Sequence, residues 1–171
     1  MEYELVTCRY NKHTWEEMCQ YREKTKIPYL CGMSIPMSSS ILLDIPVFVI
    51  EMNNSLNEIM GIGLIRNKYE TDKHHKIYSD TNYNRFIYTG KYYLSRVTLE
   101  NYYSELVDIL DEILFKGKTH SKRGGGFTKI PKKVLEYDIC KDIDIKSEIR
   151  KLFIYHFREE SNSHPSAVMV S

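Results

Sequence analysis

The sequence predicts an α+β fold, in which strands and amphipathic helices belong to one domain. Two strongly apolar segments, 46–52 and 59–67, are joined by the turn sequence NNSLNE and predict a β-hairpin. Segment 98–117 carries apolar residues at helical spacing and predicts a long amphipathic helix. The chain has 171 residues, a length that suits a single domain. We therefore expect one domain over 1–160 and a flexible C-terminal tail over 161–171.

The N-terminal segment predicts a strand followed by a short helix. Residues 3–10 alternate in polarity and are rich in residues that favour strands. Thr14 and Glu17 have the spacing of a capping box, so the side chain of Thr14 can begin a helix. We expect this helix from Trp15 to about Lys24, with Trp15 on its inward face.

Loops and shorter strands alternate in the middle of the chain. Segment 26–40 contains two prolines, a glycine and three consecutive serines, and predicts a loop with a short strand near 29–31. Segment 68–84 is polar and lacks periodicity, so we expect a long exposed connection. Segment 85–97 is again typical of a strand, with a turn or bulge at Thr89–Gly90.

The C-terminal third predicts two helices separated by a polar segment. Thr98 can cap the helix over 98–117, and Gly117 suits its end. The sequence at 133–139 is compatible with either a strand or a helix. Apolar residues recur at helical spacing over 144–160 and predict the second amphipathic helix.

Two glycines interrupt the apolar strand at 59–67. Gly61 and Gly63 alternate with larger apolar residues, so both face the same side of the strand. Small residues on one face let another backbone or a ligand approach the strand closely.

Segment 116–133, KGKTHSKRGGGFTKIPKK, concentrates positive charge in a chain whose net charge is only +1. It contains seven lysine and arginine residues and no acid. Three consecutive glycines can turn their amide groups toward one point and form an anion-binding concavity, for which phosphate is a natural ligand. The alternative is a solvated surface loop, which is the usual meaning of a charged run. A phosphate-binding loop of the Walker A type is excluded, because its first glycine would fall at Glu112.

Aromatic residues near the expected loops suggest how bases would be held. Rings stack on bases while cations hold phosphates, which is typical of single-stranded or flipped nucleotides. We expect base stacking by Tyr29, Tyr92 and Phe127. The expected contacts with nucleic acid are Lys118, His120, Lys122, Arg123, Gly124, Gly125, Gly126, Lys129, Lys132 and Lys133.

No catalytic site, metal site or cofactor is expected. The four cysteines include no C-x-x-C pair and are expected to be free thiols. The adjacent His74 and His75 form no recognised ligand motif and are expected to be exposed. The sequence has no run of about 18 apolar residues and no signal-peptide pattern, so we expect a cytoplasmic or nuclear protein without a membrane segment. Its richness in isoleucine, lysine, asparagine and tyrosine suggests an AT-rich genome, viral or parasitic.

The order of these motifs resembles the PUA-like superfamily, and within it the EVE and YTH branch. The similar features are Pro46-Val47-Phe48, then Gly61-Ile62-Gly63, a strand pair around YTGKYYLSR, and the later HSKRGGGFTKIP. The resemblance covers about residues 1–137 and implies a mixed β-barrel flanked by helices. It also implies recognition of a modified or flipped base in an aromatic cage. YTH cages use tryptophans, whereas this chain has only Trp15, so tyrosines would replace them.

These features lead to three functional hypotheses. The first is a domain that binds RNA or DNA through the basic loop and an aromatic pocket. The second is a protein-interaction or structural module, a homo-oligomer for example, in which the acidic helix at 98–115 and the basic loop meet complementary charges. The third is an enzyme acting on nucleic acid with His120 as a base, which the sequence supports least.

Overall fold

The computed structural model describes residues 2–163, which form two sheets, four α-helices and two short 3-10 helices. The strands are β1 (Glu4–Tyr10), β2 (Tyr29–Met33), β3 (Pro46–Asn53), β4 (Glu58–Arg66), β5 (Phe86–Gly90), β6 (Tyr92–Ser95) and β7 (Thr128–Lys129). The helices are α1 (Lys12–Thr25), α2 (Arg96–Phe115), α3 (Lys132–Leu135) and α4 (Ile145–Ser163), with 3-10 turns at Thr81–Asn84 and Asp138–Cys140. The predicted α+β class is confirmed.

The larger sheet has five strands in the order β6-β4-β3-β1-β7. Strands β1 and β3 are parallel, with Glu4 opposite Val47, and the other neighbouring pairs are antiparallel. The predicted hairpin is β3 and β4, which lie at the centre of the sheet. Because β3 is covered on both faces, its sequence is an almost continuous apolar run.

The second sheet contains only β2 and β5, and the described residues form no closed barrel. Strand β5 continues into β6 through Lys91, but β6 pairs with β4 while β5 pairs with β2. The hydrogen-bonding partner therefore changes at Lys91, and the two sheets remain separate ladders. The expected mixed β-barrel is therefore not closed in the described part of the chain, which has a five-stranded sheet with a two-stranded sheet beside it.

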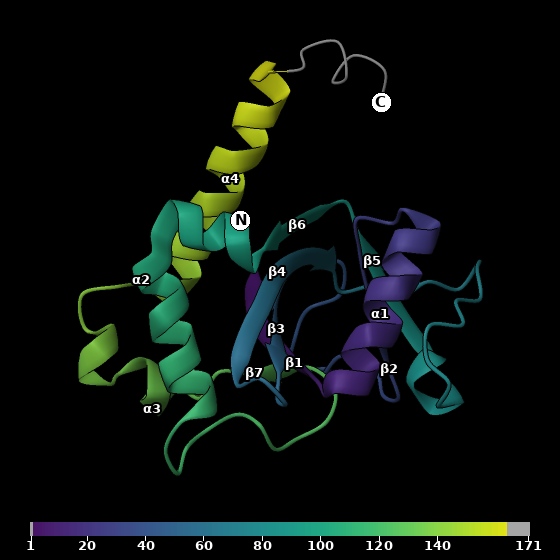
Figure 1. Cartoon of the computed structure of the whole chain (residues 1–171), viewed down its shortest axis with the longest axis horizontal. Coiled ribbons are helices and arrows are strands. Elements are labelled where there is room, and N and C mark those ends of the chain that lie inside the picture. The colour runs from purple at the N-terminus through teal and green to yellow at the C-terminus, as the bar shows by residue number, and fades with distance from the viewer. Residues whose placement is uncertain (1, 164–171) are drawn as a thin grey trace.

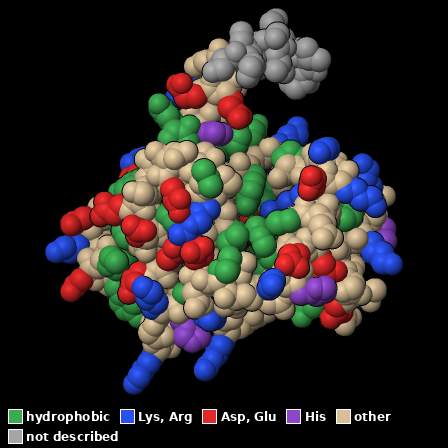
Figure 2. Space-filling model, in the orientation of Figure 1, with side chains coloured by type: hydrophobic (Ala, Val, Ile, Leu, Met, Phe, Trp, Pro, Cys, Tyr) green, Lys and Arg blue, Asp and Glu red, His purple; other side chains and the backbone are tan. Residues whose placement is uncertain are grey.

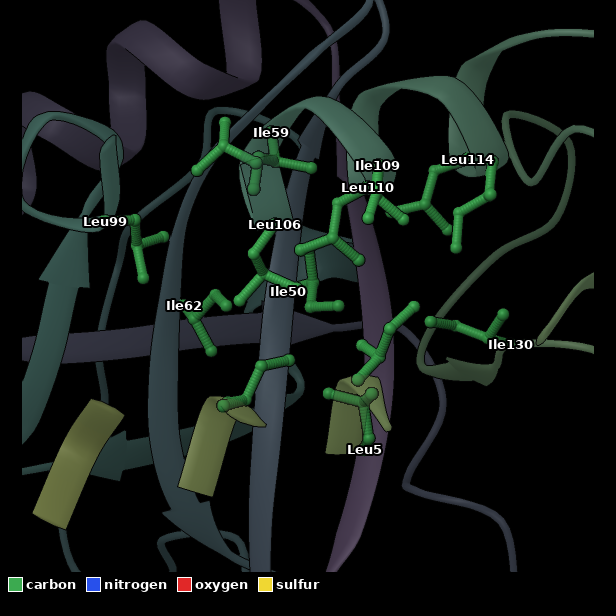
Figure 3. Close-up of a cluster of buried hydrophobic side chains, with 14 of the residues drawn as sticks. Leu5, Ile50, Ile59, Ile62, Leu99, Leu106, Ile109, Leu110, Leu114 and Ile130 are labelled. Atoms are coloured by element: carbon green, nitrogen blue, oxygen red, sulfur yellow. The ribbon is translucent and has the colours of Figure 1, made fainter. Parts of the chain in front are cut away.

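The larger sheet separates two apolar cores. Helices α2 and α4 cover one face, and α1 with β2 and β5 covers the other (Figure 1). On the first face, Leu106 and Leu110 of α2 pack onto Ile50 and Ile62 of the central strands (Figure 3). On the second face, Val6, Val49 and Met18 belong to a core that also contains several tyrosines. Burial on both faces is the main stabilising contribution that the sequence pattern predicts.

Helices α1 and α2 start earlier than the sequence predicts. Helix α1 is capped by Asn11 rather than Thr14. Thr14 is the third residue of the helix and completes the capping box, because its hydroxyl accepts from the amide of Asn11. Helix α2 is capped by Ser95 rather than Thr98. The segment compatible with strand or helix begins with the short helix α3 and ends in a 3-10 turn.

Two expectations about exposure are corrected. The connection 68–84 is not fully exposed, because Ile77 and Tyr78 insert into the second core. The tail was expected from residue 161, but α4 extends to Ser163, and residues 164–171 lie outside the described part. Within residues 2–163, no helix combines the length and the apolar character needed to cross a membrane.

Candidate functional site

The glycine-rich segment is held against the sheet by Arg9, at the C-terminal end of β1. The acceptors of the Arg9 guanidinium are all neutral. Its Nε donates to Gly124 O (3.0 Å), and its Nη2 donates to Gly126 O (2.8 Å). Its Nη1 lies within hydrogen-bond distance of Ser121 O (3.0 Å), Thr128 Oγ1 (3.0 Å) and Thr7 Oγ1 (3.2 Å). A second anchor is Asn54, whose Nδ2 donates to the carbonyl oxygen of Lys122 at 2.9 Å. The segment is therefore a defined loop rather than a loose connection.

The charge of Arg9 has no counter-ion in the described part of the chain. None of the ion pairs among residues 2–163 involves Arg9, and its hydrogen-bond acceptors are carbonyl and hydroxyl oxygens. Burial lowers the pKa of Arg9, because removal from water disfavours the charged form. A partly desolvated cation without a carboxylate is stabilised when an anion binds beside it.

A pocket of about 330 Å³ lies next to this arginine. It is lined by Arg9, Tyr10, Asn11, Thr14, Gly32, Met33, Ser34, Asn54, Tyr78, Tyr83, Gly124, Gly125 and Gly126. Arg9 is the only charged residue in this set, and no lining residue carries a carboxylate. We call it the Arg9 pocket.

The three glycines that line the Arg9 pocket leave their amide groups unused in the described part of the chain. In the described residues, none of the amide groups of Gly124, Gly125 and Gly126 donates to a protein acceptor. Gly124 and Gly126 have φ angles of 119° and 68°, which residues with a side chain rarely adopt. Positions 124 and 126 therefore require glycine, whereas position 125 does not, and the triplet leaves three amide donors without acceptors in the described residues.

Two tyrosines form another wall of the Arg9 pocket. Tyr78 is buried, Tyr83 is 43% exposed, and their ring centroids lie 6.1 Å apart. The side chain of Asn84 fixes this segment, because its Oδ1 accepts from the amides of Ile77 and Tyr78 and its Nδ2 donates to Tyr78 O. Sequence reasoning missed both tyrosines, although the Asp80 cap and the turn sequence SDTNYN were visible signals of a compact loop.

The predicted basic residues lie around the loop but not inside the pocket. Lys118, Arg123, Lys132 and Lys133 are exposed, and Lys122 is half-buried. None of these five residues makes an ion pair within residues 2–163, whereas Lys129 pairs with Glu4 at 3.3 Å. Figure 2 shows lysine and arginine side chains projecting at the lower edge of the molecule, where Figure 1 places the loop between α2 and β7.

The three residues predicted to stack on bases do not share one pocket. Tyr29 has no exposed surface, and its neighbours are Tyr93 and Arg22. Tyr92 is 43% exposed but belongs to β6, at the edge of the sheet opposite β7, where its ring packs against Phe157. Phe127 lies in the basic loop and packs on Tyr88 at 5.1 Å. In this fold Tyr29 offers no face to an outside base, so that expectation is corrected.

An aromatic cage does exist, but Arg22 fills it. The Arg22 guanidinium lies 4.9 Å from the ring of Tyr29, 5.1 Å from that of Tyr93 and 5.8 Å from that of Trp15. Arg22 pairs at 2.5 Å with the fully buried Glu51, which also accepts from the hydroxyl of Tyr93 at 2.6 Å. Burial opposes the charge on Arg22, but Glu51 outweighs it, so the pKa of Arg22 is raised well above its ordinary value.

Gly61 and Gly63 make room for this cage. A Cβ at Gly63 would collide with the ring of Tyr29, and one at Gly61 would collide with Tyr93. The close approach predicted for these glycines is confirmed, and the groups that approach are aromatic rings of the same chain.

His120 and His75 each have hydrogen-bond partners within the chain. His120 Nδ1 accepts from the amide of Lys122 at 3.2 Å within the loop. His75 is buried, contrary to expectation, because it lies between Tyr21 (2.8 Å) and Glu70 (2.7 Å). Residues 2–163 contain no cluster of three or more histidine, cysteine or acidic side chains able to hold a metal ion.

Comparison of the chain with protein-family models, with curated proteins and with solved structures finds no match.

Proposed function

We propose that this protein binds nucleic acid, with the backbone phosphates on the basic loop and one nucleotide in the Arg9 pocket. The observation that carries the proposal is Arg9 itself, a partly buried cation that has no counter-ion within residues 2–163 and lies at a pocket whose lining has no carboxylate. Five further basic residues without ion pairs surround that loop, as a polyanion requires.

The pocket suits a nucleotide better than a simple inorganic ion. Tyr83 lines the pocket and is 43% exposed, and aromatic rings stack on any base. Asn54 also lines the pocket, and within residues 2–163 its buried Oδ1 has no hydrogen-bond partner, so one acceptor remains unused beside the pocket. The aromatic groups in this proposal are therefore Tyr78 and Tyr83, with Phe127 in the adjoining loop. Membership of the PUA-like superfamily remains a prediction from the sequence motifs.

The test removes two charges from the loop. Lys122→Ala combined with Arg123→Ala should weaken binding of a fluorescent single-stranded oligonucleotide, measured by anisotropy over a range of salt concentrations. The slope of log K against log salt should fall by about 1.4, since each phosphate contact on a single strand contributes about 0.7. RNA and DNA oligonucleotides of the same sequence are compared in parallel.

The matched control removes two exposed lysines away from the loop, Lys24 and Lys91, by the same change to alanine. This double variant has the same net charge as the first. If both variants weaken binding equally, the loop is not the contact surface. If the wild-type protein binds neither RNA nor DNA, the proposal fails altogether.

The alternative of self-association through opposite charges has less support. Glu100 and Asp111 of α2 both pair with Arg96, and Glu112 pairs with Lys116, so part of the acidic charge of the helix is already compensated within the chain. Gel filtration at low and high salt distinguishes the two functions, because salt-sensitive association without nucleic acid would favour the alternative.

A further inference from the structure

We infer that the Arg9 pocket recognises the phosphorylated end of a single strand, a terminal phosphomonoester rather than an internal phosphodiester. This inference rests on the proposed function and specifies the ligand of the same site. It depends on four features of the pocket: its charge, its donors, its size and the ring beside it.

The charge of the pocket favours a dianion. A phosphomonoester carries about −1.5 to −2 charges at neutral pH, whereas an internal phosphodiester carries one. Arg9 contributes a full positive charge, and the thirteen lining residues contribute no negative charge against it. Repulsion from a carboxylate, which would disfavour a dianion most strongly, is absent from this lining.

The number of unused donors beside the pocket suits a group with several free oxygen atoms. Arg9 Nη2 carries two N–H groups and makes a single hydrogen bond within residues 2–163, to Gly126 O. The amides of Gly124, Gly125 and Gly126 add three donors without protein acceptors. A terminal phosphate presents three acceptor oxygens, which matches this set better than the two free oxygens of a phosphodiester.

The size of the pocket sets how much of the strand can enter. A volume of about 330 Å³ is at the lower end of the range of about 300–1,000 Å³ that is typical of small-molecule sites. It is sufficient for one nucleotide. An internal phosphate needs space for a sugar on both sides, whereas a terminal phosphate enters with one sugar and leaves the rest of the strand outside.

The remaining wall suits the first nucleotide of such a strand. Tyr83 lines the pocket and is 43% exposed, so we place the first base against its ring. From there the strand reaches the loop, where Lys122 and Arg123 adjoin the glycine triplet in sequence.

The experiment compares strand ends. Single-stranded ten-nucleotide probes with a 3′ fluorophore carry either a 5′-phosphate or a 5′-hydroxyl group, and a second pair with a 5′ fluorophore carries a 3′-phosphate or a 3′-hydroxyl group. One phosphorylated probe should bind about tenfold or more tightly than its hydroxyl counterpart, as expected for several hydrogen bonds to a charged group. Uridine 5′-monophosphate and inorganic phosphate serve as competitors.

A charge placed in the pocket provides the variant. A Cβ at Gly125 would meet nothing within 4 Å, so Gly125→Asp fits the fold and adds a carboxylate beside the free amides. It should abolish the preference for the phosphorylated end. The matched control, Val97→Asp, makes the same charge change at an exposed position of α2 and should keep the preference. In the wild type, the preference should shrink as the pH falls through the second phosphate pKa of about 6.

The outcomes separate the inference from the function on which it rests. Equal affinity for phosphate and hydroxyl ends, with binding retained, would overturn the inference and leave nucleic-acid binding in place. Absence of binding to every probe would overturn both. Competition by uridine 5′-monophosphate or phosphate at concentrations as low as those of the oligonucleotide would assign the pocket to a free metabolite and overturn recognition of a strand end. Loss of the preference in Val97→Asp as well as in Gly125→Asp would show that net charge, and not the pocket, creates it.

Discussion

Individual glycines have two opposite roles in this chain. In β4, Gly61 and Gly63 are small because the rings of Tyr93 and Tyr29 occupy the space where a Cβ would lie. In the basic loop, Gly124 and Gly126 are required by their positive φ angles, and Gly125 is surrounded by open space. The same residue type therefore tolerates substitution very differently in the two places.

The contrast predicts the stability of two alanine variants. Gly63→Ala forces a methyl group into the ring of Tyr29, which is packed against Tyr93 and Arg22, and should lower the free energy of unfolding by about 1–3 kcal/mol. Gly125→Ala should change it by less than about 0.5 kcal/mol, as is usual at open surface positions. Urea denaturation followed by circular dichroism measures both values. Equal values for the two variants would mean that the Tyr29 ring does not occupy this space in solution.

At the scale of single residues, the sequence predicts types of contact better than partners. It indicates that Gly61 and Gly63 allow close approach, but not that the approaching rings belong to the same chain. Glu17 was assigned to a capping box, yet it accepts from the amide of Ser79, 62 residues away. Such partners are chosen by the tertiary fold, which local spacing does not encode.

At the scale of elements, hydrophobic periodicity predicts nearly all the long helices and strands. The strands at 46–52 and 59–67 and the helices at 98–117 and 144–160 are confirmed within a few residues. Periodicity fails where an irregular segment is buried. The sequence of residues 77–84 shows no helical or strand periodicity. This segment is instead ordered by hydrogen bonds from the side chain of Asn84 to the backbone, which periodicity cannot reveal.

This explanation predicts that Asn84 stabilises its segment. Asn84→Ala leaves the buried amides of Ile77 and Tyr78 without acceptors. The free energy of unfolding should therefore fall by about 1–3 kcal/mol for each unsatisfied amide. Asn82→Ala is the matched control, because Asn82 is exposed in the same 3-10 turn. Chemical denaturation compares the two. A loss as large for Asn82→Ala as for Asn84→Ala would contradict the role given to the Asn84 amide.

At the scale of the whole molecule, the candidate site is formed by segments far apart in the sequence. The Arg9 pocket unites the end of β1, the start of α1, the segment at 78–83 and the glycine triplet, which lies more than a hundred residues from Arg9. The glycines and their neighbouring charges were predicted from composition. Arg9, Tyr78 and Tyr83 were not, because a single arginine in a strand and two tyrosines in a polar segment have no local pattern that indicates a shared pocket.

The central sheet also isolates a second core in which thiols are buried beside tyrosines. Cys8 and Cys31 both lie in this core without exposed surface. Burial raises the pKa of Cys31 from 9.0 to about 12 and also raises that of Cys8 well above its ordinary value. In the unfolded chain these thiols lose their protons near the ordinary value, whereas in the folded chain they retain them.

The stability of the protein should therefore depend on alkaline pH with a definite sign. At a pH well below 9, both the folded and the unfolded state bind the thiol protons, and stability does not depend on them. As the pH rises through 9 toward 12, the unfolded state binds fewer protons than the folded state, so the free energy of unfolding falls. Each buried thiol contributes up to about 1.4 kcal/mol per pH unit to this slope. Urea denaturation of the wild type and of Cys31→Ala in reducing buffer between about pH 8 and about pH 10 measures it, because the buried tyrosines, which also contribute in this range, contribute equally to both proteins. Cys31→Ala should reduce the slope, while Val49→Ala, which removes volume from the same core without removing a thiol, should lower stability and keep the slope. If Cys31→Ala and the wild type have equal slopes, Cys31 ionises as readily in the folded chain as in the unfolded one, and the sheet does not seal this core from solvent.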